Sequence, residues 1–161
     1  MAANWQLEVT RPEQREDILT VARNAVIFTA EEVATVEELL DAYITRGPQA
    51  SGYNFLSCLV DGNVVGFACY GPRALTSGTY DLFWIAVDRA MQGKGLGKAL
   101  SEGTLQDVKA LGGRLLVAET SGKAEYGPTR KFYEADSWVC EATLADFYAP
   151  GDAMVIYIKR L

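Results

Sequence analysis

The residues best suited to chemistry form a glycine-rich loop between two segments of regular structure. The loop is Gln92-Gly93-Lys94-Gly95-Leu96-Gly97-Lys98. Residues 80–87 before it are apolar, aromatic and branched, which predicts a buried strand, and residues 98–111 after it predict a helix. Backbone N–H groups of such a loop are free to bind an anion, and the helix dipole favours negative charge at the helix N-terminus. We therefore expect a phosphate group to bind at this loop.

Three phosphate-binding motifs and a flexible surface turn are the alternatives for this loop. A P-loop requires G-x-x-x-x-G-K-[ST], but the glycine-to-lysine spacing is one residue short and Ala99 replaces the hydroxyl. A dinucleotide-binding motif requires G-x-G-x-x-G, and here the third glycine comes one place early. A flexible turn would not need apolar segments of regular period on both sides. The third motif fits, because Gln92-x-x-Gly95-x-Gly97 resembles the Q/R-x-x-G-x-G/A pyrophosphate loop of the GNAT superfamily of acyl-CoA N-acyltransferases.

A second motif near the C-terminus supports the same resemblance. The A-x-x-F/L-Y-E-x-x-G-F signature of the superfamily resembles the segment Thr129-Arg130-Lys131-Phe132-Tyr133-Glu134-Ala135-Asp136-Ser137-Trp138. The sequence departs from the pattern at two places. Ser137-Trp138 replaces Gly-Phe, and Tyr126 stands where an asparagine is common. The second departure replaces a residue that is expected to form a hydrogen bond to the cofactor.

Composition and charge argue against several classes of protein. We expect one domain over residues 1–161, with a core large enough to be stable alone. The formal net charge of −6 argues against a nucleic-acid partner and is compatible with a cationic substrate. No apolar run approaches the roughly 20 residues of a membrane helix, and residues 1–6 lack the basic start and hydrophobic region of a secretory signal. We expect a cytoplasmic protein with no membrane partner.

The absence of histidine restricts the chemistry further. The chain has no Ser-His-Asp triad, no Cys-His pair and no histidine-ligated metal. Carboxylates, tyrosine, lysine or water must therefore act as the general acid and the general base. We expect no metal cofactor. The three cysteines, Cys58, Cys69 and Cys140, are far apart in the sequence, and we expect buried, reduced thiols.

The rest of the sequence predicts the elements that position these motifs. Helices are expected after two capping boxes, Thr10-Arg11-Pro12-Glu13 and Thr29-Ala30-Glu31-Glu32, and the second helix should end at Gly47-Pro48. Another short helix should begin at Pro128. Strands are expected at residues 7–9, 53–60, 64–70, 80–87, 114–120, 138–143 and 153–161, with a hairpin at Asp61-Gly62-Asn63 and a loop over residues 146–152.

The resemblance implies the GNAT fold, an α/β (α+β) architecture. Its central mixed sheet has six to seven strands and is flanked by about four helices. Strand 80–87, the glycine loop, the next helix and strand 114–120 should form one βαβ unit, whose two strands splay apart near Glu119 to admit the substrates. Strict alternation places Asp81, Phe83, Ile85 and Val87 on one face of the central strand.

The reaction that the resemblance implies is transfer of an acetyl group from the thioester of acetyl-CoA to a primary amine. A protonated amine has no lone pair, so a base must accept its proton. Asp81 matches the strand position of the glutamate in the histone-acetylating branch, and Glu119 is the alternative base; both are equally compatible with solvated strand-end carboxylates. A backbone N–H near Ile85 should stabilise the oxyanion. Tyr133 matches the superfamily's acid, since a tyrosine pKa of about 10 lies above a thiol pKa of about 8.5.

The resemblance also assigns binding residues. For acetyl-CoA, the cosubstrate, they are Ile85, Ala86, Val87, Gln92, Gly93, Lys94, Gly95, Leu96, Gly97, Lys98, Tyr126 and Arg130. For Lys94 and Lys98, a free position on the surface is the alternative to a phosphate contact, and for Arg130 exposure to solvent is an equal alternative. The residues themselves, without the resemblance, indicate an acceptor pocket with the aromatic residues Phe28, Trp84 and Tyr148 and with acidic residues to attract a cationic amine, namely Glu31, Glu32, Asp146 and Asp152. Core packing for the aromatic residues and solvated surface for the acidic residues are equal alternatives.

The identity of the acceptor stays open at this point. We expect a small primary amine. N-terminal or lysine acetylation of a protein is the alternative, because the segment before the last strand resembles the aromatic-rich loop of ribosomal-protein alanine acetyltransferases. An acyl-CoA-binding sensor would bind acetyl-CoA without turnover, and a purely structural domain would not bind it. The partners expected are acetyl-CoA, an amine and, as a further expectation, a second copy in a homodimer.

Overall fold

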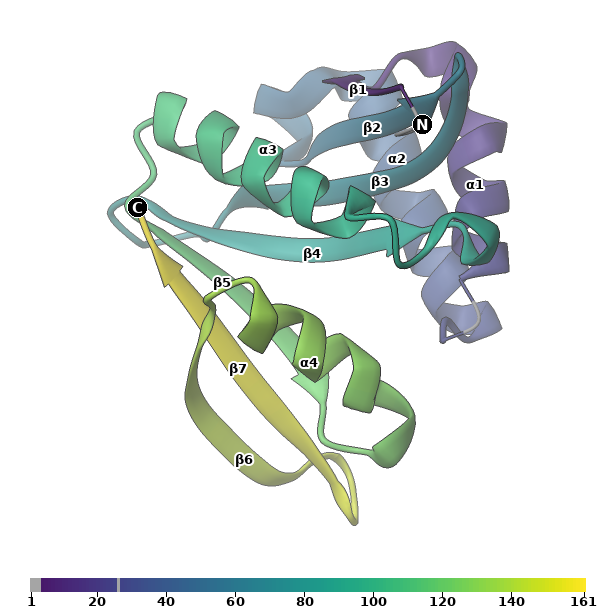
Figure 1. Ribbon diagram of the computed structural model, residues 1–161. Coiled ribbons are helices and arrows are strands. Elements are labelled where there is room, and N and C mark those ends of the chain that lie inside the picture. Colours follow the sequence, from purple (N-terminus) through teal and green to yellow (C-terminus); the bar gives the residue numbers. More distant parts are fainter. Residues whose placement is uncertain (1–3, 26) are drawn as a thin grey trace.

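A seven-stranded mixed sheet forms the centre of the computed structural model, which describes residues 4–25 and 27–161 (Figure 1). The strand order is β1-β2-β3-β4-β5-β7-β6, and every neighbouring pair is antiparallel except β4–β5. The strands are β1 (Trp5–Val9), β2 (Asn54–Val60), β3 (Asn63–Pro72), β4 (Thr79–Val87), β5 (Leu115–Ser121), β6 (Val139–Ala149) and β7 (Asp152–Arg160). The predicted mixed sheet is confirmed.

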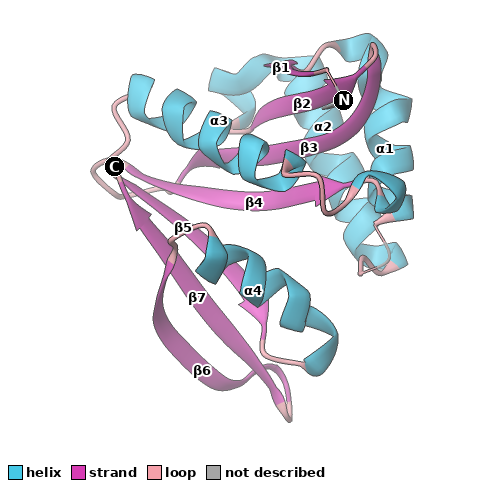
Figure 2. Cartoon of the chain, in the orientation of Figure 1, coloured by secondary structure: helices cyan, strands magenta, loops and turns pink. Residues whose placement is uncertain are grey.

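Four α-helices among the described residues cover the two faces of this sheet (Figure 2). They are α1 (Arg15–Asn24), α2 (Ala30–Ser51), α3 (Leu96–Ala110) and α4 (Gly127–Ala135). One apolar core lies beneath α1 and α2, and a second lies beneath α3 and α4. Within the described residues, no helix is long and apolar enough to cross a membrane. Residues 1–3 of the N-terminal segment considered above lie outside the described residues.

The two predicted capping boxes have different outcomes. At α2 the pattern is confirmed: the backbone N–H of Glu32 donates to Thr29 Oγ1 (3.2 Å), and the backbone N–H of Thr29 donates to Glu32 Oε2 (2.7 Å). Before α1 the prediction is wrong, because the Thr10 hydroxyl is hydrogen-bonded to the Ser57 hydroxyl in the core (2.7 Å). A 3₁₀ turn, Pro12–Gln14, comes first instead, and α1 follows it.

A β-bulge in β4 overturns the predicted alternation of its side chains. Trp84 lies opposite Cys69 and Leu82 lies opposite Tyr70, so Phe83 has no partner in β3. One extra residue exchanges the two faces of a strand. Leu82 and Ile85 therefore both contact the core beneath α3 and α4, and Asp81, next to Leu82, points to the opposite face. Asp81 does not share a face with Ile85 and Val87, as had been expected.

The parallel strands β4 and β5 are paired over only part of their length. Thr79 to Leu82 of β4 pair with Leu115 to Ala118 of β5, and beyond that point the strands diverge (Figure 1). The helix between them, α3, begins at Leu96, two residues earlier than predicted, because Gly95 is its N-cap. The expected splay is confirmed, and it begins one residue before Glu119.

The C-terminal hairpin differs from its prediction. The expected loop over residues 146–152 is mostly strand, because β6 continues to Ala149 and β7 begins at Asp152. Asp146 adopts a positive φ of 54°, and its Oδ1 accepts a hydrogen bond from the backbone N–H of Gly151 (2.7 Å). Its carboxylate therefore closes the hairpin turn instead of attracting an amine. Cys58 and Cys69 are buried, as predicted, but Cys140 on β6 is exposed.

The other predicted boundaries differ from the structure by shorter distances. Gly47, with a φ of 76°, interrupts α2 where its end was predicted, but one more turn follows it. Strand β3 includes Gly71 and Pro72, which were expected to end it. The two-residue hairpin turn at Asp61 and Gly62 is confirmed, with a positive φ at both residues.

A buried polar cluster follows α4 where the sequence departs from the superfamily pattern. Asp136, whose side chain is 6% exposed, accepts hydrogen bonds from the Ser101 hydroxyl (2.6 Å) and from Trp138 Nε1 (3.3 Å). Lys159 Nζ lies 3.4 Å from the same carboxylate. Ser137, in the position of the pattern's glycine, keeps the positive φ (63°) that glycine favours.

Replacing Asp136 with alanine is expected to destabilise the fold by about 3 kcal/mol, because the buried Ser101 hydroxyl would lose its acceptor and the Lys159 ammonium would lose its counter-charge, keeping only the backbone carbonyl of residue 136. The free energy of unfolding in urea measures this effect. Asp17→Ala, on the exposed surface of α1, is the matched control, and its cost should stay below about 1 kcal/mol. Equal losses in the two variants would contradict the importance of the cluster.

Candidate active site

Two adjoining cavities lie where β4 and β5 diverge. The first, of about 680 Å³, is called the acidic cavity here, and the second, of about 930 Å³, is called the loop cavity because the glycine loop lines it. The two cavities meet at shared lining residues from β4, the segment before α2, and the segment from Lys123 into α4. These are Ile27, Phe28, Thr29, Ile85, Lys123, Tyr126 and Thr129.

The glycine loop presents an open backbone surface to the loop cavity. Gly93 and Gly95 adopt positive φ values of 75° and 81°, and a Cβ at either position would meet no atom within 4 Å. Gly95 is also the N-cap of α3, so the positive end of a 15-residue helix points toward this surface. An open cradle of N–H groups at a helix N-terminus fits the pyrophosphate of coenzyme A.

Most of the predicted cofactor-binding residues line the loop cavity. They are Ile85, Ala86, Val87, Gln92, Gly93, Gly95, Leu96, Gly97, Lys98 and Tyr126. Two of them also have a structural role: Gln92 Nε2 donates to the Val87 carbonyl (3.1 Å), and a Cβ on Gly97 would lie 3.1 Å from the Phe132 ring. Gly97 therefore allows α3 to approach α4 closely.

Two predicted cofactor contacts, Lys94 and Arg130, lie outside the lining of both cavities. Lys94 Nζ lies 3.4 Å from Met91 Sδ. Arg130 Nη1 donates to the backbone carbonyls of Ser121 (2.7 Å) and Lys123 (2.8 Å). Arg130 thus holds the segment after β5 in place, and its contact with the cofactor stays a prediction. Lys98 lines the loop cavity, and its Nζ lies 3.7 Å from Glu102 on the exposed surface of α3.

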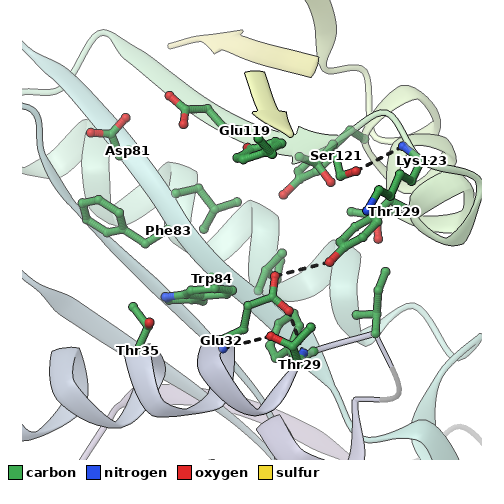
Figure 3. A pocket seen from close by; sticks show the side chains of 18 of the residues that line it. Thr29, Glu32, Thr35, Asp81, Phe83, Trp84, Glu119, Ser121, Lys123 and Thr129 are labelled. Carbon is green, nitrogen blue, oxygen red and sulfur yellow. Dashed lines mark hydrogen bonds between the residues drawn. The ribbon is translucent and has the colours of Figure 1, made fainter. Parts of the chain in front are cut away.

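Carboxylates outnumber basic groups around the acidic cavity. Among the charged residues that line it, Glu31, Glu32, Asp81, Glu119 and Asp152 are acidic, and Arg73 and Lys123 are basic. Figure 3 shows Asp81 and Glu119 on one side of this cavity and Glu32 on another. A concave surface with an excess of one sign of charge attracts ligands of the opposite sign. The acidic cavity therefore favours a cation.

The two candidate bases, Asp81 and Glu119, are brought together by Arg73. Arg73 Nη2 lies 2.6 Å from Asp81 Oδ1 and 3.1 Å from Glu119 Oε1. The hydrogen bond to Asp81 and the one to Glu119 raise the pKa of the Arg73 guanidinium above its usual value. The sequence did not single out Arg73, because it follows Gly71-Pro72, a pattern that predicts a turn and carries no information about distant partners.

Tyr133 of α4 supplies a protonated hydroxyl to the acidic cavity. The residue is 5% exposed, and its ring stacks on Tyr157 (centroids 5.2 Å apart) and packs edge-on against Trp138 (5.1 Å). Burial raises the pKa of Tyr133 well above its ordinary value, so the hydroxyl keeps its proton at neutral pH. Within the described residues the hydroxyl has no hydrogen-bond partner, which leaves it free to donate to a ligand.

The aromatic residues predicted for the acceptor pocket all line the acidic cavity. Phe28 and Trp84 form an edge-to-face pair (centroids 5.1 Å apart), and Tyr148 reaches the cavity from β6. Tyr126 lines both cavities, and its hydroxyl donates to Glu32 Oε1 (3.3 Å). Tyr126 therefore links the start of α4 to α2 across the junction between the cavities.

Comparisons with known proteins agree with this geometry. Residues 20–135 match the model of the acetyltransferase (GNAT) family. A Desulfovibrio desulfuricans protein described as an acetyltransferase of the GNAT family is 41% identical, with a TM-score of 0.93 over 98% of this chain and 99% of that one. No curated protein matches the chain.

Two more distant structures share the fold. The ribosomal-protein-S18-alanine N-acetyltransferase of Escherichia coli is 17% identical, with a TM-score of 0.77 over 98% of this chain and 94% of that one. The PaiA N-acetyltransferase of Thermoplasma acidophilum, in complex with coenzyme A, is 18% identical, with a TM-score of 0.77 over 98% of this chain and 99% of that one.

Proposed function

Because the chain belongs to the GNAT family of acetyltransferases, we propose that it transfers the acetyl group of acetyl-CoA to the primary amine of a small cationic molecule. The observation that carries this proposal is the meeting of two unlike cavities at Ile85. One cavity has a backbone cradle for a pyrophosphate, and the other has carboxylates and the hydroxyl of Tyr133. The acetyl thioester would lie at their junction, with the amine approaching through the acidic cavity.

Different residues around the junction have different roles in the reaction. Asp81, or alternatively Glu119, accepts a proton from the ammonium group of the acceptor, directly or through water. A backbone N–H of β4 near Ile85 stabilises the oxyanion of the transferring acetyl group. Tyr133 donates its proton to the sulfur of the leaving thiolate, since a thiol pKa of about 8.5 lies below that of any tyrosine with a raised pKa.

The acidic cavity supports a small acceptor in preference to a folded protein surface. Its volume of about 680 Å³ falls within the range of roughly 300–1,000 Å³ that is typical of small-molecule sites. Its excess of carboxylates complements an ammonium group, and the Phe28–Trp84 pair offers apolar surface to a carbon chain. A peptide N-terminus is the second candidate, since Tyr148 on the exposed hairpin borders the same cavity.

The test is a screen for thiol release from acetyl-CoA with a panel of amines. The panel should contain diamines, aminoglycosides, amino acids and short peptides with free N-termini. We expect turnover with a small amine whose net charge is positive. We expect none with amines whose carboxylates or other acidic groups make the whole molecule neutral or negative. Turnover on peptides alone would replace the small-molecule acceptor by a protein N-terminus. Binding of acetyl-CoA without turnover on any amine would favour the sensor.

A further inference from the structure

Arg73 lies at the point where the two strands around the acidic cavity begin to part. It follows the last residue of β3, and its backbone N–H donates to the Thr79 carbonyl (2.9 Å) at the start of β4. Its guanidinium reaches Asp81 with two nitrogens: Nε lies 2.9 and 3.0 Å from the two carboxylate oxygens, and Nη2 lies 2.6 Å from Oδ1. The same Nη2 donates to Glu119 Oε1 (3.1 Å).

The register of the sheet places these three side chains on one face. Asp81 is opposite Gly71 in β3 and opposite Val117 in β5. Arg73 and Glu119 each lie two residues beyond these partners, so strand alternation returns them to the face of Asp81. Asp81 comes from β4 and Glu119 from β5, and the hydrogen bonds between the two strands end at Leu82 and Ala118. Arg73 therefore bridges β4 and β5 where the two strands begin to diverge.

The negative charges of Asp81 and Glu119 explain why a cation is needed between them. Without the guanidinium, two carboxylates would face each other on adjacent strands, and like charges at this spacing repel. With it, the unit of three residues keeps a formal charge of −1. The Asp81 side chain is only 13% exposed, so its orientation depends on this partner more than on water. The other charged or titratable groups that line the cavity are Tyr148 of β6, Asp152 of β7, Glu31 and Glu32 of α2, Lys123 and Tyr126 before α4, and Tyr133 of α4.

We infer that Arg73 is a positioning residue of the reaction, holding Asp81 and Glu119 so that they accept the acceptor's proton as one unit. This inference rests on the proposed N-acetyl transfer. It explains why the structure brings the two candidate bases together: neither acts alone, and the guanidinium sets the position of both. Once the proton is accepted from the ammonium, the unit is neutral overall, and its proton passes to solvent through the open side of the cavity.

The test compares three variants in steady-state kinetics with the best amine from the screen. Arg73→Met keeps the length of the side chain and removes its charge. We expect it to lower kcat by about 10²-fold, the loss that misplacement of a catalytic group typically causes, with little change in KM for acetyl-CoA. Arg73→Lys should restore part of kcat. Arg46→Met, on the exposed surface of α2, should behave as the wild type.

A second comparison separates positioning from a merely structural role. Glu119→Gln should lower kcat in the wild-type background and have a much smaller effect in Arg73→Met, because residues that act as one unit are not additive. A folded Arg73→Met variant with wild-type kcat, or one in which Glu119→Gln keeps its full effect, would overturn the inference while leaving N-acetyl transfer intact. Failure of the wild type to turn over any amine would overturn both proposals.

Discussion

Replacing Gly95 with glutamate is expected to lower the affinity for acetyl-CoA by at least about 100-fold. The backbone cradle at Gly95 is open, with no atom within 4 Å of a Cβ built there, so the new side chain would enter the space proposed for the pyrophosphate. It would also add a negative charge at the N-terminus of α3, where the proposed ligand is itself an anion. Repulsion of a few kcal/mol between charges about 4 Å apart at an intermediate dielectric is enough for this loss. Calorimetric titration with acetyl-CoA measures it.

Two controls separate the charge from the strain of a positive φ. Gly95→Ala adds the strain of the left-handed conformation, about 1–2 kcal/mol, without a charge, and it should weaken binding far less. Gly112→Glu places the same side chain at a glycine with a similar φ (86°), also with no atom within 4 Å, at the opposite end of α3. It should bind acetyl-CoA as the wild type does. Undiminished affinity in a folded Gly95→Glu variant would remove the pyrophosphate from this loop.

The loop could be predicted from sequence because its structure is local. Gly93 and Gly95 both require a positive φ, a property of the residues themselves, and the strand before the loop and the helix after it have clear apolar periods. The same reasoning succeeds at the hairpin turn of Asp61-Gly62 and at the Thr29 capping box of α2. In each case the residues that form the contact lie within a few positions of one another.

The arrangement of side chains around the acidic cavity could not be predicted in this way. The bulge at Phe83 depends on how β4 pairs with β3, and a single unpaired residue changes the face on which Asp81 lies. The bridge from Arg73 to Glu119 joins residues 46 positions apart. Thr10 had a suitable sequence for a helix cap, but a more distant partner, Ser57, takes its hydroxyl. All three arrangements depend on contacts between residues that are far apart in the sequence.

The direction of long side chains could not be predicted from sequence either. Lys94 belongs to the glycine loop, and Arg130 lies one helical turn before Tyr133, so both were expected at the cofactor. The backbone around them is as predicted, but neither side chain lines a cavity. A long side chain on a loop or helix can turn toward several partners, and Arg130 donates to the carbonyls of Ser121, at the end of β5, and Lys123. Sequence spacing does not determine that choice.

Replacing Tyr133 with phenylalanine is expected to lower kcat by about 10²–10⁴-fold, the usual contribution of a general acid. The change removes only the hydroxyl, and the ring keeps its contacts with Tyr157 and Trp138. Affinity for acetyl-CoA should be nearly unchanged, because the proposed hydrogen bond forms as the thiolate departs. A fall in kcat with constant affinity marks an interaction made only in the transition state. Because burial raises the pKa of Tyr133, the wild-type hydroxyl should stay protonated at assay pH values up to about 10, the ordinary tyrosine pKa.

The neighbouring tyrosine provides the matched control. Tyr157 stacks on Tyr133 and is also buried (1% exposed), but its hydroxyl donates to Glu134 (2.9 Å) and does not line the acidic cavity. Tyr157→Phe should therefore cost about 1 kcal/mol of stability and leave kcat close to that of the wild type. Similar losses of kcat in the two variants would indicate that the packing of α4, and not the Tyr133 proton, is what the reaction requires. An unchanged kcat in Tyr133→Phe would assign protonation of the thiolate to water, which can reach the sulfur through the open side of the acidic cavity.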